Sequence, residues 1–306
     1  SGGYKYHTFL TGDNFVISGG SLAVDLFMIG GGGGGGAARY GGGGGAGGLI
    51  WIKDMTLTSQ TCVIVIGGGG NGDNGSLSGK TNGVDTTMTR STGNLTAKGG
   101  GWGASGDNTT TTYGLGNVGG CGGGGMNYNT GSDNFGTSNQ SSQAGDSGTY
   151  GIGFSGGRGY SSPNYDGGGG GGLSEVGVSA TNTSGGTSGR GGHGVHTLSG
   201  LSQAETTTFL AAGASSQSEV VSSVRYIGAG GGGGGHNPVS AIGSGNRVPG
   251  GHGFGGDSGV QGSKSAGLAA PANSGSGGGG CSVDTSNNTQ PGGAGGSGIV
   301  IIRYPL

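Results

Sequence analysis

The sequence predicts an all-β domain, a β-sandwich into which a bundle of extended glycine segments is inserted, and three observations predict it. Of the 306 residues, 92 are glycine. The glycines stand in blocks, such as 30–36 and 41–48. Apolar runs rich in β-branched and aromatic residues flank these blocks, as 22–29 and 49–52 do. We therefore expect a single glycine-rich domain over residues 1–306.

Composition limits the kind of core that the chain can form. Hydrophobic residues make up 29% and charged residues 8% of the chain, against about 45–50% and about 25% in an average soluble domain. A conventional apolar core therefore cannot extend along the whole length. The alternative is a disordered linker rich in glycine and serine, but a linker does not set glycine blocks against β-branched runs.

Ordered glycine blocks have few available conformations. An α-helix is disfavoured by about 1 kcal/mol per glycine relative to alanine. Collagen requires glycine at every third position with abundant proline, whereas this chain has 6 prolines and continuous glycine runs. The polyglycine II helix remains, with the three-residue turn of polyproline II and no internal hydrogen bonds. Its N–H and C=O groups must pair with neighbouring segments, so we expect a bundle of many segments.

The first strands of the sandwich are predicted from apolar runs. Residues 4–10 and 14–18, separated by Gly12 and Asp13, are typical of a hairpin. Run 22–29 is the third strand and leads directly into glycine. The next strands expected are 49–55 and 61–66, and 84–90 and 95–98 are weaker candidates.

Further strands are expected in the second half of the chain. Residues 191–201 and 206–212 suggest two of them, and 220–227 is a clear strand pattern that leads into glycine. The run 299–304 is continuously apolar, which is typical of a central strand buried on both faces. We predict that it pairs with the N-terminal strands. The main strands thus fall in 4–29, 49–66, 220–227 and 299–304.

The transitions between strand and glycine at 24–30, 41–50, 63–67 and 295–304 carry a family resemblance. They resemble the glycine-rich domain at the C-termini of tail-fibre and related virion proteins of tailed phages, over nearly the whole chain. They are also similar to the polyglycine II bundles of phage tail-fibre tip adhesins and of the extracellular glycine-rich domain of anaplastic lymphoma kinase. The resemblance implies a host-recognising module of a virion, and a sandwich of the jelly-roll type found in tumour necrosis factor.

Charge and hydropathy limit the partners. The net charge is −2, and the 12 lysines and arginines are scattered, which argues against nucleic acid and anionic membranes as partners. No apolar run approaches the roughly 20 residues of a membrane span, so we expect no membrane insertion.

Catalytic motifs are weak, and we predict that the chain is not an enzyme and uses no cofactor. Residues 75–81 resemble a phosphate-binding loop, but Asn74 stands where the first glycine belongs and no helix pattern follows. The glycine–serine pattern at 153–157 fits a nucleophile elbow by chance in so glycine-rich a chain.

No metal site is expected either. His193, His196, His236 and His252 lack a nearby cysteine or acidic cluster, which favours scattered loop positions over a metal site. Three cysteines argue against a disulfide framework and leave at least one unpaired. We expect Cys62 in the core, and Cys121 and Cys281 in gaps beside the glycine segments.

Polar segments between 102 and 165 carry single aromatic residues among asparagine, serine, threonine and glycine. Rigid aromatic anchors among adaptable polar residues are typical of binding loops. The alternative is that each aromatic packs back onto a glycine segment. Exposure is favoured for Tyr128, Tyr150 and Tyr165, whose neighbours are polar. The candidate receptor-binding residues are Trp102, Tyr113, Tyr128, Phe135, Tyr150, Tyr160 and Tyr165.

The resemblance, together with the aromatic loops, favours a non-enzymatic adhesin of a virion tail fibre, located on the virion or outside the cell. It would bind a cell-surface glycan or an outer-membrane protein and would contact other virion fibre proteins. By analogy with fibres we expect a homo-oligomer, with a trimer as the suggested form. The alternatives are a structural fibre subunit that associates through strand edges and an ice-binding protein, against which the bulky, irregular loops argue.

Overall fold

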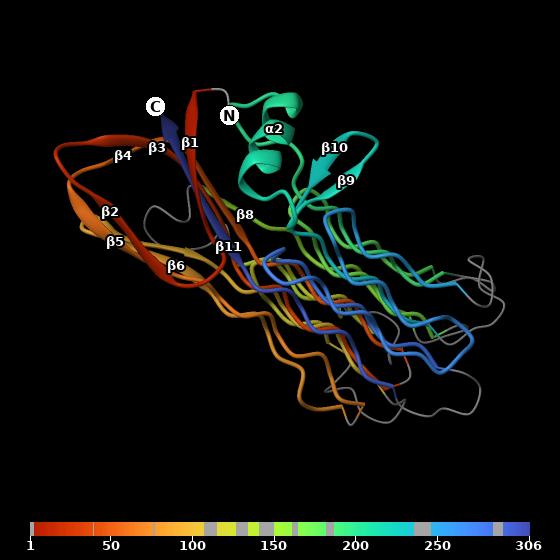
Figure 1. The fold of residues 1–306 in the computed structure, drawn as a ribbon. Coiled ribbons are helices and arrows are strands. Elements are labelled where there is room, and N and C mark those ends of the chain that lie inside the picture. Colours follow the sequence, from red (N-terminus) through yellow and green to blue (C-terminus); the bar gives the residue numbers. More distant parts are fainter. Residues whose placement is uncertain are drawn as a thin grey trace.

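A computed structural model shows a β-sandwich joined end-on to an elongated bundle of glycine segments (Figure 1). The described residues are 3–38, 40–75, 77–106, 115–126, 134–140, 150–160, 165–181, 187–235, 246–283 and 290–306.

Two sheets form the sandwich. The five-stranded sheet has the order β1 (Tyr4–Phe9), β11 (Ile299–Pro305), β3 (Leu22–Ile29), β4 (Leu49–Leu57) and β8 (Gly151–Ile152). The four-stranded sheet has the order β2 (Asp13–Ile17), β5 (Gln60–Val65), β6 (Thr86–Arg90) and β7 (Gly93–Ala97). All neighbouring strands are antiparallel. The sandwich is confirmed; its jelly-roll form stays a prediction.

Strand β11 lies between β1 and β3, which confirms the predicted closure by the last strand. His7 of β1 pairs with Ile302, and Leu26 of β3 pairs with Ile302 from the other side. Arg303 and Asp25 face each other in this register, and Arg303 Nε donates to Asp25 Oδ2 at 2.7 Å. The five-stranded sheet is buried on both faces, which is why β3 and β11 are apolar without alternation.

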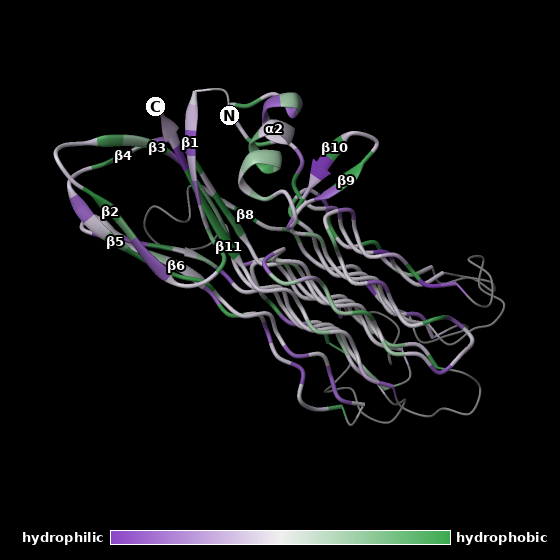
Figure 2. Ribbon diagram, in the orientation of Figure 1, coloured by the Kyte–Doolittle hydropathy of each residue, from purple (hydrophilic) through white to green (hydrophobic). Residues whose placement is uncertain are grey.

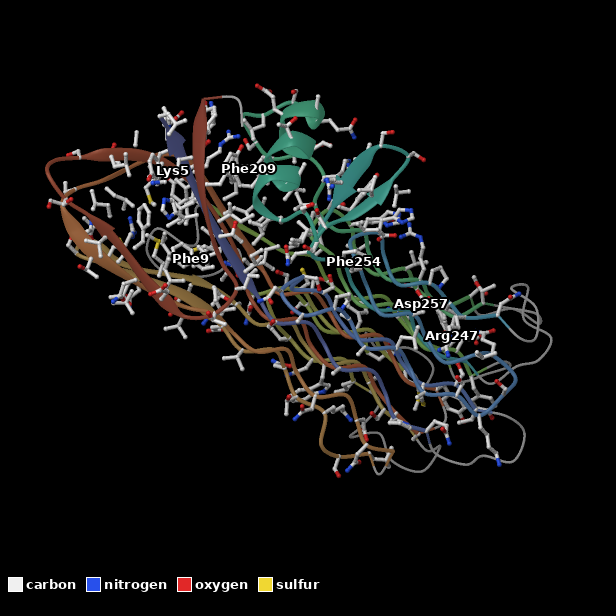
Figure 3. All side chains as sticks on the ribbon, in the orientation of Figure 1. Lys5, Phe9, Phe209, Arg247, Phe254 and Asp257 are labelled. Carbon is white, nitrogen blue, oxygen red and sulfur yellow. The ribbon has the colours of Figure 1, made fainter. Side chains whose placement is uncertain are left out.

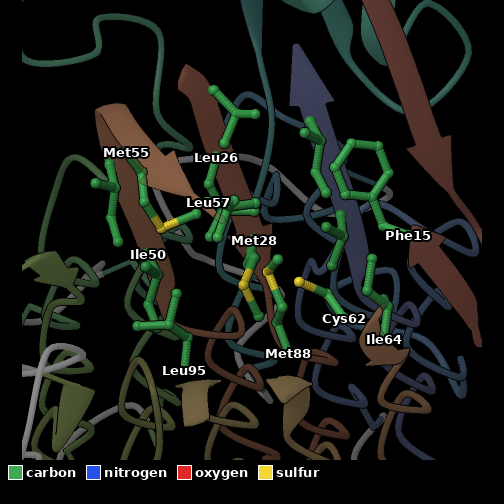
Figure 4. Close-up of a cluster of buried hydrophobic side chains, with 14 of the residues drawn as sticks. Phe15, Leu26, Met28, Ile50, Met55, Leu57, Cys62, Ile64, Met88 and Leu95 are labelled. Atoms are coloured by element: carbon green, nitrogen blue, oxygen red, sulfur yellow. The ribbon is translucent and has the colours of Figure 1, made fainter. Parts of the chain in front are cut away.

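The apolar core of the sandwich lies between its two sheets (Figure 4). Each strand contributes the residues that point to this face, so the contributions alternate along the chain. The largest contributions to the core come from β3 and β4, whose side chains face those of β5, β6 and β7. The core includes Phe15, Leu26, Met28, Ile50, Met55, Leu57, Cys62, Ile64, Met88 and Leu95.

The predicted hairpin of 4–10 and 14–18 is wrong. Strand β1 pairs with β11 and β2 pairs with β5, so the two strands belong to different sheets. Their side chains meet across the core instead, with the rings of His7 and Phe15 5.2 Å apart. Packing of the His7 ring against the buried Phe15 outweighs the local pairing that a short connection favours.

A second apolar cluster covers the other face of the five-stranded sheet. Helix α2 (Gln203–Gly213) places Phe209 and Leu210 against Phe27 and Trp51. The strand predicted at 206–212 is therefore wrong. Ser202 caps the helix through a capping box with Glu205, a local signal that the threonine-rich segment concealed.

The strand predicted at 220–227 is two strands. β9 (Glu219–Val221) and β10 (Val224–Tyr226) form a hairpin whose turn residues, Ser222 and Ser223, have φ of 48° and 68°. A two-residue turn in which both residues have positive φ matches the twist of the strands in a tight hairpin. The strand predicted at 191–201 is also wrong, because this segment joins the bundle and makes an isolated bridge from Val195 to Ile227.

The glycine bundle is made of extended segments without helix or ladder pairing. Their N–H groups bond sideways, as predicted, and along 30–36 each neighbouring segment recurs every third residue. The N–H groups of Gly30, Gly33 and Gly36 donate to Gly48, Gly45 and Gly42, those of Gly31 and Gly34 to Val84 and Thr81, and those of Gly32 and Gly35 to Gly296 and Gly293. This repeat is expected of a three-residue turn; the polyglycine II helix itself stays a prediction.

Backbone fills the space between the segments. A Cβ on Gly33 would overlap the carbonyl group of Gly101, and one on Gly44 would overlap that of Gly33. The bundle is accordingly almost neutral in hydropathy, whereas apolar residues gather in the sandwich and under α2 (Figure 2). Glycine is required here for close approach and not for an unusual φ.

Candidate functional site: the distal end of the bundle and the Trp102 groove

Side chains are sparse along the middle of the bundle and return at its ends and flanks (Figure 3). The distal end is the one farther from the sandwich. Here buried polar residues replace glycine, and we call them the distal polar layer: Asp73, Ser105, Asn134, Asp166, Ser188, Gln261 and Ser282.

The distal polar layer bonds backbone groups where the segments stop. The Ala37 N–H donates to Ser105 Oγ at 2.9 Å, and the Gly235 N–H donates to Ser282 Oγ at 3.1 Å. Asn134 accepts from the Gly159 N–H and donates to its C=O, at 3.2 and 3.1 Å. These side chains satisfy groups that have no further segment to pair with, as capping residues do at helix ends.

One aspartate of this layer has a cation beside it. Lys80 Nζ lies 3.5 Å from Asp73 Oδ2, and Ser105 Oγ donates to the same oxygen at 2.6 Å. Burial lowers the pKa of Lys80, and the Asp73 carboxylate acts in the opposite direction. Residues 81–85 form no helix and precede strand β6. Lys80 is therefore not followed by the helix of a phosphate-binding loop, and it contacts the distal polar layer through Asp73.

The second aspartate has no cationic partner among the described residues. Asp166 Oδ1 accepts from Ser188 Oγ at 2.8 Å, and Ser188 Oγ accepts from Gln261 Nε2 at 3.0 Å. Burial raises the pKa of Asp166 to about 7, although the Ser188 hydrogen bond acts against this shift. Within the described part of the chain, Asp166 Oδ2 and Gln261 Oε1 are buried without a hydrogen-bond partner.

Two predicted binding tyrosines flank Asp166 at the distal end. Tyr160 exchanges both backbone hydrogen bonds with Asp166, each 2.8 Å long. Tyr165 was expected to be exposed, and this is wrong: it is half-buried and stacks on Tyr40 with ring centroids 5.1 Å apart. Tyr40 is itself 1% exposed and packs with Met126. The polar neighbours of Tyr165 in sequence did not reveal this stack.

Trp102 lies in a groove of about 570 Å³ on the flank of the bundle. The Trp102 groove is lined by Leu77, Ser78, Gly79, Lys80, Trp102, Leu115, Gly116, Asn117 and Val118. Leu115 and Val118 are 53% and 43% exposed, so the groove presents apolar side chains beside Trp102.

Hydrogen bonds of the Asn82 side chain fix the walls of the Trp102 groove. Asn82 Oδ1 accepts from the Trp102 N–H and from Asn117 Nδ2, both at 3.0 Å. Asn82 Nδ2 donates to the Val118 C=O at 3.0 Å. One side chain therefore holds the segments that carry Trp102 and Val118 in register. Sequence reasoning missed Leu115 and Val118, whose signal is an isolated apolar residue among glycine and polar residues.

The remaining predicted residues do not join this groove. Phe135 is half-buried on segment 134–140. Tyr150 is 41% exposed, as expected, but it precedes β8 at the sandwich end. Tyr113 and Tyr128 lie outside the described residues. The seven candidates therefore do not form one surface in the part that the structure describes.

Three histidines expected to be scattered lie together where the bundle meets the β9–β10 hairpin. The rings of His193 and His252 stack 4.5 Å apart, and the rings of Tyr226 and His196 lie 4.8 Å apart. The backbone N–H of His252 donates to His193 Nδ1 at 2.9 Å. Residue 236, the fourth histidine, is outside the described ranges. Among described residues, no group of three histidine, cysteine or acidic side chains is arranged to hold a metal.

All three cysteines are buried and free; the odd number had required only that at least one be unpaired. Cys62 belongs to the sandwich core. Cys121 Sγ donates to the Gly172 C=O and Cys281 Sγ to the Ala38 C=O, both at 3.1 Å. Burial raises the pKa of each of these two thiols to about 12.

Among the described residues no helix has both the length and the apolar character to cross a membrane.

Comparison with known proteins gives one family. The sequence model of a family described as a glycine-rich domain matches residues 8–305. No curated protein matches the chain.

Proposed function

The chain belongs to the glycine-rich domain family, and on this premise we propose that it is a non-enzymatic recognition module of an extracellular fibre, such as a virion tail fibre. Its ligand is a cell-surface glycan or an outer-membrane protein. The Trp102 groove is the observation that carries the proposal, because it joins a tryptophan to two exposed apolar side chains on a fixed backbone.

The physical argument for binding is preorganisation. Association is opposed by the ordering of loops and side chains at an interface. The Trp102 groove stands on segments already fixed by the Asn82 hydrogen bonds, so little ordering remains. Tryptophan is also among the residues that contribute most to binding when they fill a well-packed pocket.

A structural fibre subunit is the second candidate, and the outer face of the four-stranded sheet favours it. Val16, Val63 and Val65 are 65%, 45% and 51% exposed there. Strand β2 is an edge of this sheet, and an uncovered edge is a template for pairing with another chain. Such pairing would give the homo-oligomer that fibres form.

A binding assay tests the first candidate. Trp102→Ala is expected to weaken binding of the purified domain to glycan arrays or outer-membrane vesicles by about tenfold or more, as for a residue contributing roughly 2 kcal/mol. Tyr4→Ala, which removes an exposed tyrosine at the sandwich end, serves as the control. Equal binding by the Trp102→Ala variant and the native chain, with unchanged melting temperature, rules out the groove.

Light scattering separates the two candidates. A discrete particle is expected for a recognition module at a fibre end. Open filaments that disperse in a Val16→Lys, Val63→Lys variant would instead favour the fibre subunit, since lysine blocks edge and face association.

A further inference from the structure

The distal polar layer contains two buried aspartates in opposite settings. Asp73 has Lys80 and Ser105 beside its carboxylate. Asp166 is fully buried and makes no ion pair with any described residue. An ionised carboxylate without a cation is strongly disfavoured in such a place, and the group then takes up a proton.

Two acceptor atoms of one hydrogen-bonded cluster lack donors within the described chain. Asp166 and Gln261 both bond the hydroxyl of Ser188, and each retains one oxygen without a partner. Their bonded atoms, Asp166 Oδ1 and Gln261 Nε2, also converge with Ser188 Oγ on Gly235, where a Cβ would contact all three. Two unpaired acceptors held by a common hydroxyl are the arrangement expected when one of them carries a hydrogen.

We infer that Asp166 is protonated on Oδ2 in the folded protein and donates this hydrogen to Gln261 Oε1. One proton then satisfies both atoms without an added ligand. The resulting chain, Asp166 to Gln261 to Ser188 and back to Asp166, fastens segments 165–172, 187–194 and 255–261 together. At a pH above its pKa, Asp166 loses this proton to solvent and becomes an uncompensated buried carboxylate. Acid therefore stabilises this hydrogen-bonded chain, which we call the latch.

No charged group on the described segments around Asp166 takes over this role. Arg190 is held by Glu175 at 2.7 Å, and Asp257 accepts from the Gly250 N–H at 2.9 Å. Arg247 donates to the Ser258 and Ala266 carbonyls. The titratable side chains on the segments around Asp166 are Arg158, Tyr160, Tyr165, Arg190, Arg247, Asp257 and Cys281, and none pairs with its carboxyl in the described chain.

The pH response follows from the sign of the shift. Burial raises the pKa of Asp166 from 3.8 to about 7, so the folded state binds this proton more tightly than the unfolded state. The contribution of Asp166 to the free energy of unfolding is complete below about pH 4. The folding equilibrium constant falls by up to tenfold per pH unit between about 4 and 7 and then levels off.

The isosteric variant Asp166→Asn tests the latch. Its amide donates permanently to Gln261 Oε1 and its oxygen still accepts from Ser188. Hydrogen-exchange protection of the Gly167 and Gly189 amides is expected to be independent of pH in the variant. In the native chain it should fall by roughly a hundredfold or more from pH 4 to pH 8. Identical pH profiles for the two chains would overturn the inference.

Asp73→Asn is the matched control, because it changes the other buried aspartate of the layer. It removes the charge beside Lys80 and is expected to lower protection at every pH between 5 and 8. A stabilised Asp73→Asn variant would contradict the contrast on which the inference rests.

A measurement on the native chain does not depend on any variant folding. In a titration followed by NMR of carbon-13-labelled aspartate, one carboxyl should titrate near pH 7. In a separate measurement, calcium added at pH 8 should leave the melting temperature of the native chain unchanged. Titration of every aspartate below pH 5, or stabilisation by calcium that Asp166→Asn abolishes, would replace the proton by a bound water or a metal ion.

Discussion

The sandwich and the glycine bundle are stable for opposite reasons. In the sandwich, side chains such as Leu26 and Met28 fill the space between two sheets, and the backbone pairs within each sheet. In the bundle, backbone fills the space, and each segment pairs with several neighbours. A side chain is the source of stability in one region and a steric obstacle in the other. The two regions therefore tolerate opposite kinds of substitution.

The largest expected effect comes from adding one carbon atom to the bundle. Gly33→Ala places a Cβ on the carbonyl group of Gly101. The overlap costs about 1–3 kcal/mol, and each hydrogen bond displaced in the neighbouring segments adds about 1 kcal/mol. We expect a loss of roughly 5 kcal/mol or a failure to fold, measured by denaturant unfolding.

The control for this prediction is a glycine in the same kind of segment. Gly68 has no atom within 4 Å of the position that a Cβ would take, and it has no positive φ. Gly68→Ala is expected to be neutral or stabilising by about 0.4–1 kcal/mol, because alanine restricts the unfolded chain. Equal effects at the two glycines would show that backbone packing does not hold the bundle.

An intermediate effect is expected from removing carbon atoms from the sandwich. Leu26 is fully buried between β11 and β4 and faces the four-stranded sheet. Leu26→Ala should destabilise the chain by about 2–5 kcal/mol through lost burial and the cavity that remains. Val16→Ala, on the exposed face of β2, should change the free energy of unfolding by less than about 0.5 kcal/mol.

The smallest effect is expected where the two regions meet. Burial, with the Arg190 charge next, lowers the pKa of His193 from 6.5. The folded state thus binds this proton less tightly, and the stability is complete above pH 6.5 and is lost as the pH falls through the lowered value. Protonation of Nδ1 would break the bond from the His252 N–H, a change of about 1 kcal/mol.

His193→Asn checks this last prediction, because its Oδ1 can accept the same bond without titrating. The melting temperature of the variant should fall less between pH 7 and pH 5 than that of the native chain. An equal fall would assign the acid response to another group. His193 near the sandwich and Asp166 at the distal end should therefore respond to acid with opposite signs.

Much of the sandwich was predictable from the sequence. Runs 22–29 and 299–304 are apolar without alternation because both faces of their sheet are covered, and this property is visible in composition alone. The pairing partner of each strand was less predictable than the strand itself. The short connection between 4–10 and 14–18 suggested that these strands pair with each other. Instead they lie in different sheets, and His7 packs against Phe15 across the core.

The helix and the candidate site were the parts least accessible to sequence reasoning. Residues 206–212 are rich in threonine, and only the Ser202–Glu205 capping box indicated helix. Trp102 was identified by its residue type, but Leu115 and Val118 join it from a different segment. The Tyr40–Tyr165 stack likewise depends on contacts between distant segments. Glycine blocks carry no pattern that tells which neighbour each segment will meet.

The central place of β11 has a kinetic consequence. β1 and β3 stay apart until residues 299–305 arrive between them, about three hundred positions along the chain. Until then both strands expose unpaired edges, which are prone to association with other chains. Because contacts between such distant residues slow folding, we expect sheet closure to be the late, rate-limiting step. A chaperone acting on this chain during synthesis would need to shield β1 and β3.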